Sequence, residues 1–203
     1  MKIYIDFDGT LFDTDRYMSD SIRTANEYGI SDVMFNKVKK ELFGEKKLFN
    51  LDRMIDYFIE KYNINVDIKE KTDELLNNDY LYSEVIDCLN ILVNSCYELY
   101  LLTYGDQEFQ MKKINSSGIN RYFKDIIITD RNKSELKLDY KDSIFIDNNP
   151  VVIEDLYNLS KNIIRIKRDS DKHTKEECHI RNIIECSDFN QVIKCLKGGF
   201  SNE

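Results

Sequence analysis

Apolar residues gather in five short runs that are rich in β-branched side chains and bounded by polar or turn-forming residues. Runs of this kind are typical of strands buried on both faces of a parallel sheet. The pattern predicts strands at Lys2–Asp6, Glu98–Thr103, Ile126–Thr129, Ser143–Asp147 and Ile163–Ile166. A further edge strand is expected near Ile180–Ile184.

Segments with the helical period lie between most of these runs. The longest is predicted at Leu81–Asn94, where the apolar residues fall on one helix face. Shorter helices are predicted at Phe109–Ser117, Val151–Leu159 and Phe189–Leu196. Alternating strands and helices indicate an α/β fold, with a Rossmann-like parallel sheet covered by helices on both faces.

The stretch between Thr14 and Tyr80 interrupts this alternation, because it shows helical periods and no convincing strand. Its predicted helices are Arg16–Tyr28, Asp32–Phe43, Leu51–Tyr62 and Ile68–Asn77. Ser31 suits the N-cap of the second helix, and Gly29 and Gly44 suit the ends of the first two. We therefore expect a core domain formed by residues 1–14 and 81–203, with a helical domain inserted at residues 15–80.

Net charge and hydropathy limit the kinds of partner that the protein is expected to bind. The net charge is −8, whereas binding of nucleic acid draws on Lys and Arg contacts with phosphates, so no nucleic acid polymer is expected. No run approaches the roughly 20 apolar residues that a membrane-spanning helix needs. The first aspartate stands at position 6, which leaves no room before it for a targeting segment. A cytoplasmic protein, monomeric or homodimeric, is expected.

The cysteines and histidines suggest no metal or redox centre. None of the five cysteines forms a C-x-x-C pair, and reduced thiols fit this pattern best. The two histidines, His173 and His179, both occur late in the chain, and nothing links them to catalysis.

Polar residues follow the predicted strands at their carboxyl ends, where open α/β sheets bind ligands. They are Asp6 and Asp8 after the first strand, Thr103 at the end of the second, Lys133 after the third, and Asp147 with Asn148 after the fourth. Carboxylates, a hydroxyl group, an amide and one cation together suit Mg²⁺ beside a phosphoryl group.

The charges of this set also balance. Asp6, Asp8 and Asp147 supply three negative charges, against one positive charge on Lys133 and two on Mg²⁺. A cation among the aspartates would cancel their mutual repulsion, and a phosphate dianion would then enter without net repulsion.

These motifs resemble those of the haloacid dehalogenase-like (HAD) superfamily of aspartate-nucleophile phosphohydrolases. Residues 6–11, DFDGTL, match the family's first motif, D-x-D-G-T-[LV]. The stretch LYLLTYGD supplies the threonine of the second motif, Lys133 the lysine of the third, and IFIDNNP the acidic fourth motif. The resemblance covers residues 2 to about 160, with the motifs in the family's order.

The resemblance implies a phosphatase that works through an aspartyl-phosphate intermediate. Asp6 would be the nucleophile, and Asp8 would protonate the leaving alcohol and then activate water. Thr103 and Lys133 would bind the transferring phosphoryl group. Gly9 would allow a tight turn that Thr10 helps to fix. Thr10, Tyr104 and Gly105 are further candidate substrate-binding residues.

Mg²⁺ would be held by Asp6, the backbone carbonyl of Asp8 and the fourth motif. Many members carry two adjacent acids there, whereas this chain has Asp147-Asn148. The DNNP form resembles a variant of carboxy-terminal-domain-type protein phosphatases in which the asparagine binds the metal. We therefore expect Asn148 to be a ligand and Asp147 to orient Lys133 or bind a metal-bound water.

Several neighbouring residues leave alternatives open. Only 13 residues separate Lys133 from Asp147, so the helix between them would be stunted, and Lys137 is a possible substitute for Lys133. Glu154 and Asp155 fit a solvated helix face better than a metal site. Asp13 and Asp106 are expected to cap helices.

The insert occupies the position of the family's C1-type cap, which closes over the active site and excludes water. Such a lid favours a small phosphorylated metabolite as substrate, as in nucleotidase- or phosphoglycolate-phosphatase-like members. Candidate contacts from the insert are Arg16, Tyr17, Lys46, Lys47 and Arg53. The alternatives are a phosphomutase with the same intermediate and a non-catalytic Mg²⁺- or phosphate-binding scaffold. Dehalogenase chemistry is disfavoured, because it has no use for the acid at Asp8.

Overall fold

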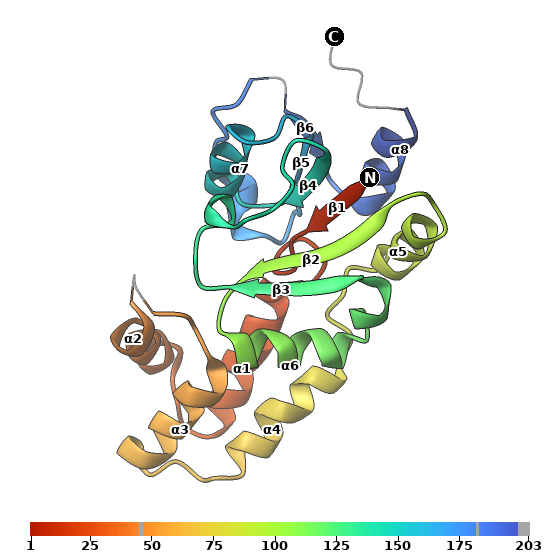
Figure 1. Ribbon diagram of the computed structural model, residues 1–203. Helices are drawn as coiled ribbons and strands as arrows, with labels where there is room; N and C mark the ends of the chain where they lie inside the picture. Colours follow the sequence, from red (N-terminus) through yellow and green to blue (C-terminus); the bar gives the residue numbers. More distant parts are fainter. Residues whose placement is uncertain (45–46, 182, 199–203) are drawn as a thin grey trace.

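The computed structural model describes residues 1–44, 47–181 and 183–198. It contains a six-stranded sheet of order β3-β2-β1-β4-β5-β6, in which every neighbouring pair is parallel (Figure 1). The strands are β1 Lys2–Ile5, β2 Glu98–Tyr104, β3 Asp125–Thr129, β4 Ser143–Asp147, β5 Ile163–Ile166 and β6 Ile184–Cys186. The predicted α/β fold class is confirmed, and five strands lie where the sequence places them.

The edge strand is the exception, because β6 overlaps its predicted range only at Ile184. Ile184 pairs with Ile164 and Cys186 with Ile166 in the register of β5 and β6. This register places the buried Cys186 on the same sheet face as Ile164 and Ile166, in one apolar core. Burial of apolar side chains against a shared core therefore selects the later segment.

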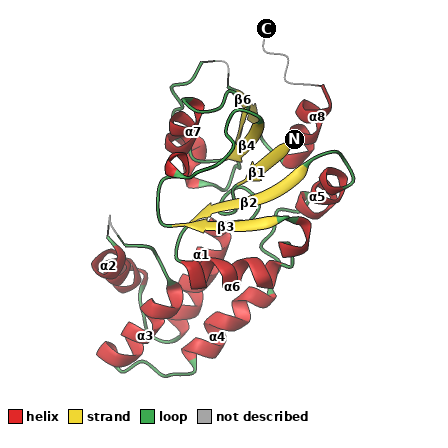
Figure 2. Cartoon of the chain, viewed as in Figure 1, coloured by secondary structure: helices red, strands yellow, loops and turns green. Residues whose placement is uncertain are grey.

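Helices cover both faces of the sheet (Figure 2). The helices α5 (Val85–Val93), α6 (Gln107–Ser117) and α8 (Phe189–Gly198) bury residues in the larger apolar core, together with Ile3 and Ile5 of β1. Tyr4 points to the opposite face, where it packs with residues of α7 (Pro150–Tyr157). The alternation along β1 is the side-chain period of a strand.

Four helices form the segment between β1 and α5. They are α1 Thr14–Glu27, α2 Asp32–Phe43, α3 Leu51–Tyr62 and α4 Ile68–Glu74, which ends in a 3₁₀ turn at Leu75–Asn77. Figure 1 shows these helices together at the lower end of the molecule, beside α6. The predicted capping is also present, since the Ser31 side chain accepts a hydrogen bond from the Met34 amide at 3.3 Å.

The two chain segments that join these helices to the sheet lie side by side. The Asp13 amide donates to the Tyr80 carbonyl at 2.8 Å, and the Tyr82 amide donates to the Leu11 carbonyl at 3.1 Å. This pairing uses residues 80–82, which explains why α5 begins at Val85 and not at the predicted Leu81. A further link is Lys112 of α6, which contacts Asp52 of α3 at 2.9 Å and Asp73 of α4 at 2.5 Å.

The cysteines are free thiols, as the sequence indicates, and Cys186 and Cys195 approach one another with 3.8 Å between their sulfur atoms. Within the described ranges, no helix has both the length and the apolar character needed to cross a membrane.

Candidate active site

A tight turn after β1 brings Asp6 and Asp8 together. The Asp6 amide continues the sheet by donating to the Ile146 carbonyl at 2.9 Å, and the Phe7 carbonyl then accepts from the Leu11 amide at 2.9 Å. Gly9 lies in this turn with φ +74°, and a Cβ there would stand 2.2 Å from Nδ2 of Asn148. Both the backbone angle and the close approach therefore require glycine.

Lys133 lies between two aspartates at the carboxyl end of the sheet. Its ammonium nitrogen is 2.5 Å from Oδ1 of Asp6 and 2.7 Å from Oδ2 of Asp147. All three side chains are buried. Lys133 begins a 3₁₀ turn after β3, and the Tyr140 hydroxyl group donates to its carbonyl at 2.8 Å. Lys137 is exposed, so the structure places Lys133, and not the alternative lysine, beside Asp6.

Burial and charge compete within this group. Burial raises the pKa of Asp6 to about 7, against the opposing effect of Lys133, while the nearby Asp147 raises it further. Burial alone would lower the pKa of Lys133, but the attraction of Asp147 and Asp6 outweighs it, and the pKa of this lysine is raised. Lys133 is therefore a fixed positive charge at the end of the sheet.

Asp8 receives hydrogen bonds on both carboxylate oxygens. Lys113 and Thr14 contact Oδ1 at 2.5 and 2.6 Å, and Nε2 of Gln110 contacts Oδ2 at 2.6 Å. Burial would raise the pKa of Asp8, but the charge and hydrogen bond of Lys113 outweigh it, so the pKa is lowered. Asp8 is thus held as a carboxylate in a defined orientation.

Lys113 and Gln110 were not predicted from the sequence, because lysine and glutamine are usually solvated. Both are 3% exposed, and they share the buried face of α6 with Phe109 and Ile114. The ammonium group of Lys113 also lies 5.2 to 5.4 Å from the ring centres of Phe7, Phe12 and Phe109. The spacing of Phe109, Gln110, Lys113 and Ile114 follows the helical period, and this is the signal that identifies the buried face.

Thr103 lies at the end of β2 and is fully buried. Its hydroxyl oxygen accepts a hydrogen bond from Nε2 of Gln110 at 3.2 Å, which leaves the hydroxyl hydrogen free to donate to a ligand. Tyr104 follows as an exposed residue that lines the same cavity. Thr103 and Tyr104 therefore both line the site cavity.

Thr10 and Gly105 do not line the cavity, contrary to their expected contact with substrate. The Thr10 side chain is completely buried, with its hydroxyl group 3.5 Å from Oδ1 of Asn148. Gly105 lies beneath the side chain of Gln110, where a Cβ would stand only 2.6 Å from Nε2. Thr10 therefore supports Asn148 from a buried position, and Gly105, which is partly exposed, leaves room for the side chain of Gln110.

The fourth-motif residues are joined by an aspartate from a later loop. Asp147 contacts Lys133, and Nδ2 of Asn148 donates to Oδ2 of Asp171 at 2.7 Å. Asp171 belongs to the loop between β5 and β6 and was not predicted. These residues line a cavity of about 440 Å³, which also reaches Lys172 and His173 of the same loop.

The donor set fits Mg²⁺ through oxygen atoms of several kinds. Within the described ranges, no three His, Cys, Asp or Glu side chains are grouped closely enough to hold a metal by themselves. The oxygen donors available at the turn are the Asp6 carboxylate, the Asp8 carbonyl and the Asn148 amide, a mixture that suits Mg²⁺. Asp6, Asp8, Asp147 and Asp171 outnumber Lys113 and Lys133 by two charges, which is the charge of a divalent cation.

The described residues of the insert that were candidate substrate contacts do not line the site cavity. Arg16 donates to the Asp79 carbonyl, and Tyr17 is buried in the aromatic core. Lys47 and Arg53 line a separate cavity of about 530 Å³ beside α2 and α3, and Lys46 lies outside the described residues. Thr14 and Asp15, at the start of α1, line the site cavity.

The other acidic residues have structural contacts. Asp13 and Asp106 cap α1 and α6, accepting from the Arg16 amide at 3.0 Å and the Phe109 amide at 3.1 Å. Glu154 accepts from the His179 amide at 2.6 Å, and Asp155 is exposed. Neither Glu154 nor Asp155 lines the site cavity.

Comparisons with known proteins point to one family. A family model described as haloacid dehalogenase-like hydrolase matches residues 3–137. A solved structure described as a haloacid dehalogenase-like hydrolase, from Burkholderia xenovorans LB400, is 15% identical with a TM-score of 0.74, and the match covers 97% of this chain and 96% of that one.

Two further solved structures have the same fold. One, described as the HAD-hydrolase YfnB from Bacillus subtilis bound to magnesium, is 15% identical with a TM-score of 0.64, covering 95% of this chain and 96% of that one. Another, described as a β-phosphoglucomutase from Thermotoga maritima, is 13% identical with a TM-score of 0.65, covering 97% and 98%. No curated protein matches this chain significantly.

Proposed function

Because the chain belongs to the haloacid dehalogenase-like hydrolase family, we propose that it is a Mg²⁺-dependent phosphatase that hydrolyses a small phosphorylated metabolite. The observation that carries the proposal is the pair of aspartates on one turn, each with its own buried lysine. Asp6 lies against Lys133 and Asp8 against Lys113, both at 2.5 Å. This arrangement separates a nucleophile from a proton carrier.

The first half of the reaction uses Asp6. Its carboxylate attacks phosphorus, and the bond from phosphorus to the leaving oxygen breaks as an aspartyl-phosphate forms. Lys133 offsets the negative charge of the phosphoryl oxygens, and the free hydroxyl hydrogen of Thr103 donates to one of them. When bound, Mg²⁺ would be held by Asp6, the Asp8 carbonyl and Asn148, and would neutralise charge on the phosphoryl group.

Asp8 transfers a proton in each half of the reaction. In the first, a proton passes from the hydrogen-bonded Lys113 ammonium group through the Asp8 carboxylate to the leaving oxygen, and the proton that Asp8 takes from water in the second half returns to Lys113. In the second, Asp8 removes a proton from water as the water oxygen attacks phosphorus and Asp6 is released. The net change consumes one water and yields an alcohol and inorganic phosphate.

The presence and placement of Asp8 favour phosphate ester chemistry over dehalogenation. A halide leaves without needing a proton, whereas an alkoxide does not leave readily unless it is protonated. A non-catalytic scaffold likewise has no chemical need for a carboxylate held by three donors. A phosphomutase would use the same groups and differs only in the acceptor of the phosphoryl group, so it remains the alternative.

A small substrate fits the dimensions of the site. The cavity of about 440 Å³ is in the range of small-molecule sites and is too small for a folded protein. We propose that the inserted helices α1–α4 act as the cap. The paired connecting segments at 11–13 and 80–82 would act as its hinge, and the contacts of Lys112 with Asp52 and Asp73 would hold it against α6.

Phosphate release from a panel of phosphorylated metabolites tests the proposal. The panel contains nucleoside monophosphates, phosphoglycolate, sugar phosphates and an aryl phosphate, each with Mg²⁺ and with EDTA. We expect release that needs Mg²⁺ and is lost in Asp6→Asn. Asp155→Asn, which changes an exposed aspartate of α7, is the matched control and should keep full activity.

Two other outcomes are informative. Conversion of a sugar phosphate to its isomer, without release of phosphate, would replace the phosphatase by a mutase. Equal phosphate release from the wild-type protein and Asp6→Asn would exclude Asp6 as the nucleophile and overturn the proposed mechanism.

A further inference from the structure

The loop between β5 and β6 brings an unpredicted carboxylate into the site. Asp171 is only 9% exposed, and its Oδ2 accepts the hydrogen bond of 2.7 Å from Nδ2 of Asn148. Its other oxygen, Oδ1, lies 3.1 Å from the position that a Cβ on Gly9 would occupy. Asp171 therefore lies directly above the turn that carries Asp6 and Asp8.

Asp171 determines which way the Asn148 amide faces. An asparagine side chain has one donor group and one acceptor group, and only Nδ2 can donate to a carboxylate. Oδ1 of Asn148 must then point away from Asp171, where the Thr10 hydroxyl group is 3.5 Å distant. That distance is too long for a strong hydrogen bond, so the hydrogen bond to Asp171 is the contact that fixes the Asn148 side chain.

The carboxylate of Asp171 also lacks a cation of its own. The ion pairs of the described residues include Asp6, Asp8 and Asp147 but not Asp171. A buried carboxylate is costly unless a positive charge lies near it. A divalent ion at the Asp6–Asp8 turn would supply that charge.

Two arginines hold the loop in place. Arg168 donates to the Thr10 carbonyl at 2.9 Å and contacts Glu84 at 2.6 Å. Arg165, which is 1% exposed, donates to the carbonyls of His173 and Glu176 at 2.8 Å. Asp171 lies between these anchors, and its amide donates to the Arg168 carbonyl at 3.0 Å.

We infer that Asp171 is a positioning residue for the metal, and that it supplies the second acid that Asp147-Asn148 lacks. It fixes the orientation of the Asn148 side chain and adds the negative charge that an asparagine ligand does not carry. The inference rests on the proposed function, because it concerns the proposed Mg²⁺ site.

Direct binding of Mn²⁺, used as a spectroscopic substitute for Mg²⁺, tests this without turnover. Electron paramagnetic resonance measures Mn²⁺ affinity in the full chain, and competition with Mg²⁺ gives the Mg²⁺ affinity. Loss of an outer partner of a metal ligand costs about 10- to 100-fold in affinity, and we expect this loss in Asp171→Ala. Asp171→Asn keeps an acceptor for Asn148 and should lose less.

Asp169→Asn is the matched control, because Asp169 is an exposed acid two positions away on the same loop. It should bind Mn²⁺ like the wild type. If Asp171→Ala fails to fold by circular dichroism, Asp171→Asn decides the question, since it preserves shape. Wild-type affinity in both Asp171 variants would overturn the inference.

A second substitution separates positioning from general damage to the loop. Asn148→Asp places a carboxylate directly on the cation, so it should restore Mn²⁺ affinity in Asp171→Ala. In the wild-type background the new carboxylate would face Asp171 at close range, so the gain in Mn²⁺ affinity should be smaller. No restoration in the double variant would contradict a positioning role.

Different results would contradict the proposed function and the inference about Asp171. A wild-type protein that binds neither Mn²⁺ nor Mg²⁺ would contradict the proposed Mg²⁺ dependence together with the inference. A wild-type protein that binds metal and releases phosphate, with Asp171→Ala unchanged in affinity, would remove the inference and leave the proposed function standing.

Discussion

The ammonium nitrogen of Lys113 lies 2.5 Å from Oδ1 of Asp8, although the two residues are separated by 105 positions in the chain. The Lys113 side chain is 4% exposed and that of Asp8 28% exposed. The pair joins the turn after β1 to the buried face of α6. The orientation of Asp8 therefore depends on the packing of a helix that carries none of the family motifs.

Replacement of Lys113 should impair proton transfer more than binding. Lys113→Met keeps the apolar stem but removes the charge partner of Asp8. We expect kcat to fall by about 10²- to 10⁴-fold, the usual contribution of acid–base catalysis, with little change in KM. The loss should be larger for an alkyl phosphate than for an aryl phosphate, because an aryl leaving group departs without a proton.

Steady-state kinetics with both substrates measure this difference. Lys113→Arg should recover part of the activity, since it restores a positive charge. Lys124→Met, which removes an exposed lysine paired with Glu98 at 2.6 Å, serves as the control and should be unaffected. An equal loss on both substrates would show that Lys113 does not act through Asp8.

Substitution of Lys133 should reduce activity and stability far more than substitution of Lys137, although the two lysines are close in sequence. Lys133→Met leaves Asp6 and Asp147 as buried carboxylates without their cation, which is destabilising. It also removes a charge from the phosphoryl site, where loss of one stabilising group costs about 10²- to 10³-fold in kcat. Lys137→Met should keep wild-type rates.

Phosphate release and urea denaturation of the two variants test this contrast. Loss of activity in Lys137→Met, with Lys133→Met active, would assign the third motif to the other lysine.

Two glycines with similar backbone angles offer a test of the Gly9 turn. Gly9 and Gly118 have φ values of +74° and +68°, but only at Gly9 would a Cβ meet other atoms within 4 Å. Gly118→Ala should cost about 1 to 2 kcal/mol of unfolding free energy from the left-handed backbone alone. Gly9→Ala should cost more, because Asn148 must also move.

Urea denaturation gives both free energies, and Mn²⁺ binding adds a second measurement. Gly9→Ala should weaken Mn²⁺ binding, whereas Gly118→Ala should leave it unchanged. Equal stability costs with unchanged Mn²⁺ binding in both variants would mean that Asn148 has room to shift away from the turn.

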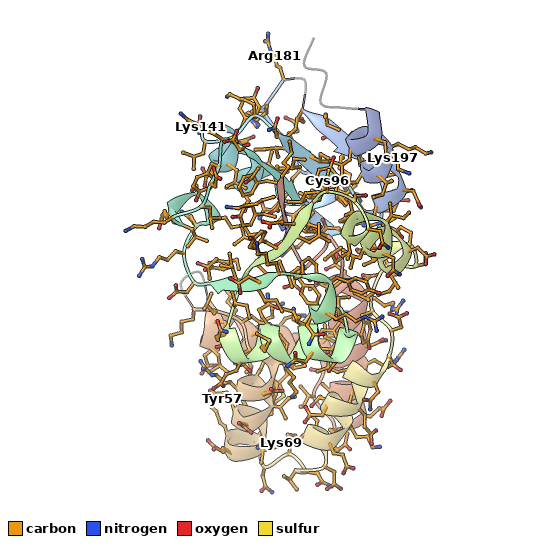
Figure 3. The ribbon with its side chains drawn as sticks, turned by 45° about the vertical axis from the view of Figure 1, so that its right-hand side comes forward. Tyr57, Lys69, Cys96, Lys141, Arg181 and Lys197 are labelled. Atoms are coloured by element: carbon orange, nitrogen blue, oxygen red, sulfur yellow. The ribbon has the colours of Figure 1, made fainter. Side chains whose placement is uncertain are left out.

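The thiols should react in an order set by burial. Burial raises the pKa of Cys88 to about 11 and that of Cys186 to about 12, so both are neutral thiols at pH 8 and react slowly. Cys96 is exposed and precedes β2, where Figure 3 labels it. We expect Cys96 to be alkylated first.

Mass spectrometry of alkylated peptides measures the order, with and without urea. Raising the pH from 8 to 9 should leave Cys186 slow to react, because burial raises the pKa of its thiol to about 12. Rapid modification of Cys186 in the folded protein would contradict the buried position of this residue in β6.

The parts of the fold that could be predicted are those with a local pattern. The runs at 143–147 and 163–166 are strands at the predicted residues, because a strand buried on both faces is mostly apolar and β-branched, as are the isoleucines of these two runs. β6 has only three residues, and its place depends on register with β5. Register is a long-range property that no short window of sequence contains.

The same distinction applies to the site. Asp6, Asp8, Thr103 and Lys133 could be found from motifs, since each follows a strand that the pattern identifies. Lys113 required knowing which side of α6 faces the core, and Asp171 required knowing the path of a loop. That path is set by Arg165 and Arg168, whose contacts lie far from them in sequence.

The position of β1 between β2 and β4 has a consequence for synthesis on the ribosome. Lys2 pairs with Glu98 on one side and with Ser143 on the other, so β1 emerges long before either neighbour exists. The helices α1–α4 all lie between β1 and β2 in the chain and are free to form in the interval, whereas long-range strand pairing is slow. A nascent chain that ends before residue 143 leaves one edge of the central strand open and lacks Asp147 beside Lys133. The proposed catalytic centre is therefore among the last parts of the molecule to assemble, although Asp6 is made well before the residues that hold it.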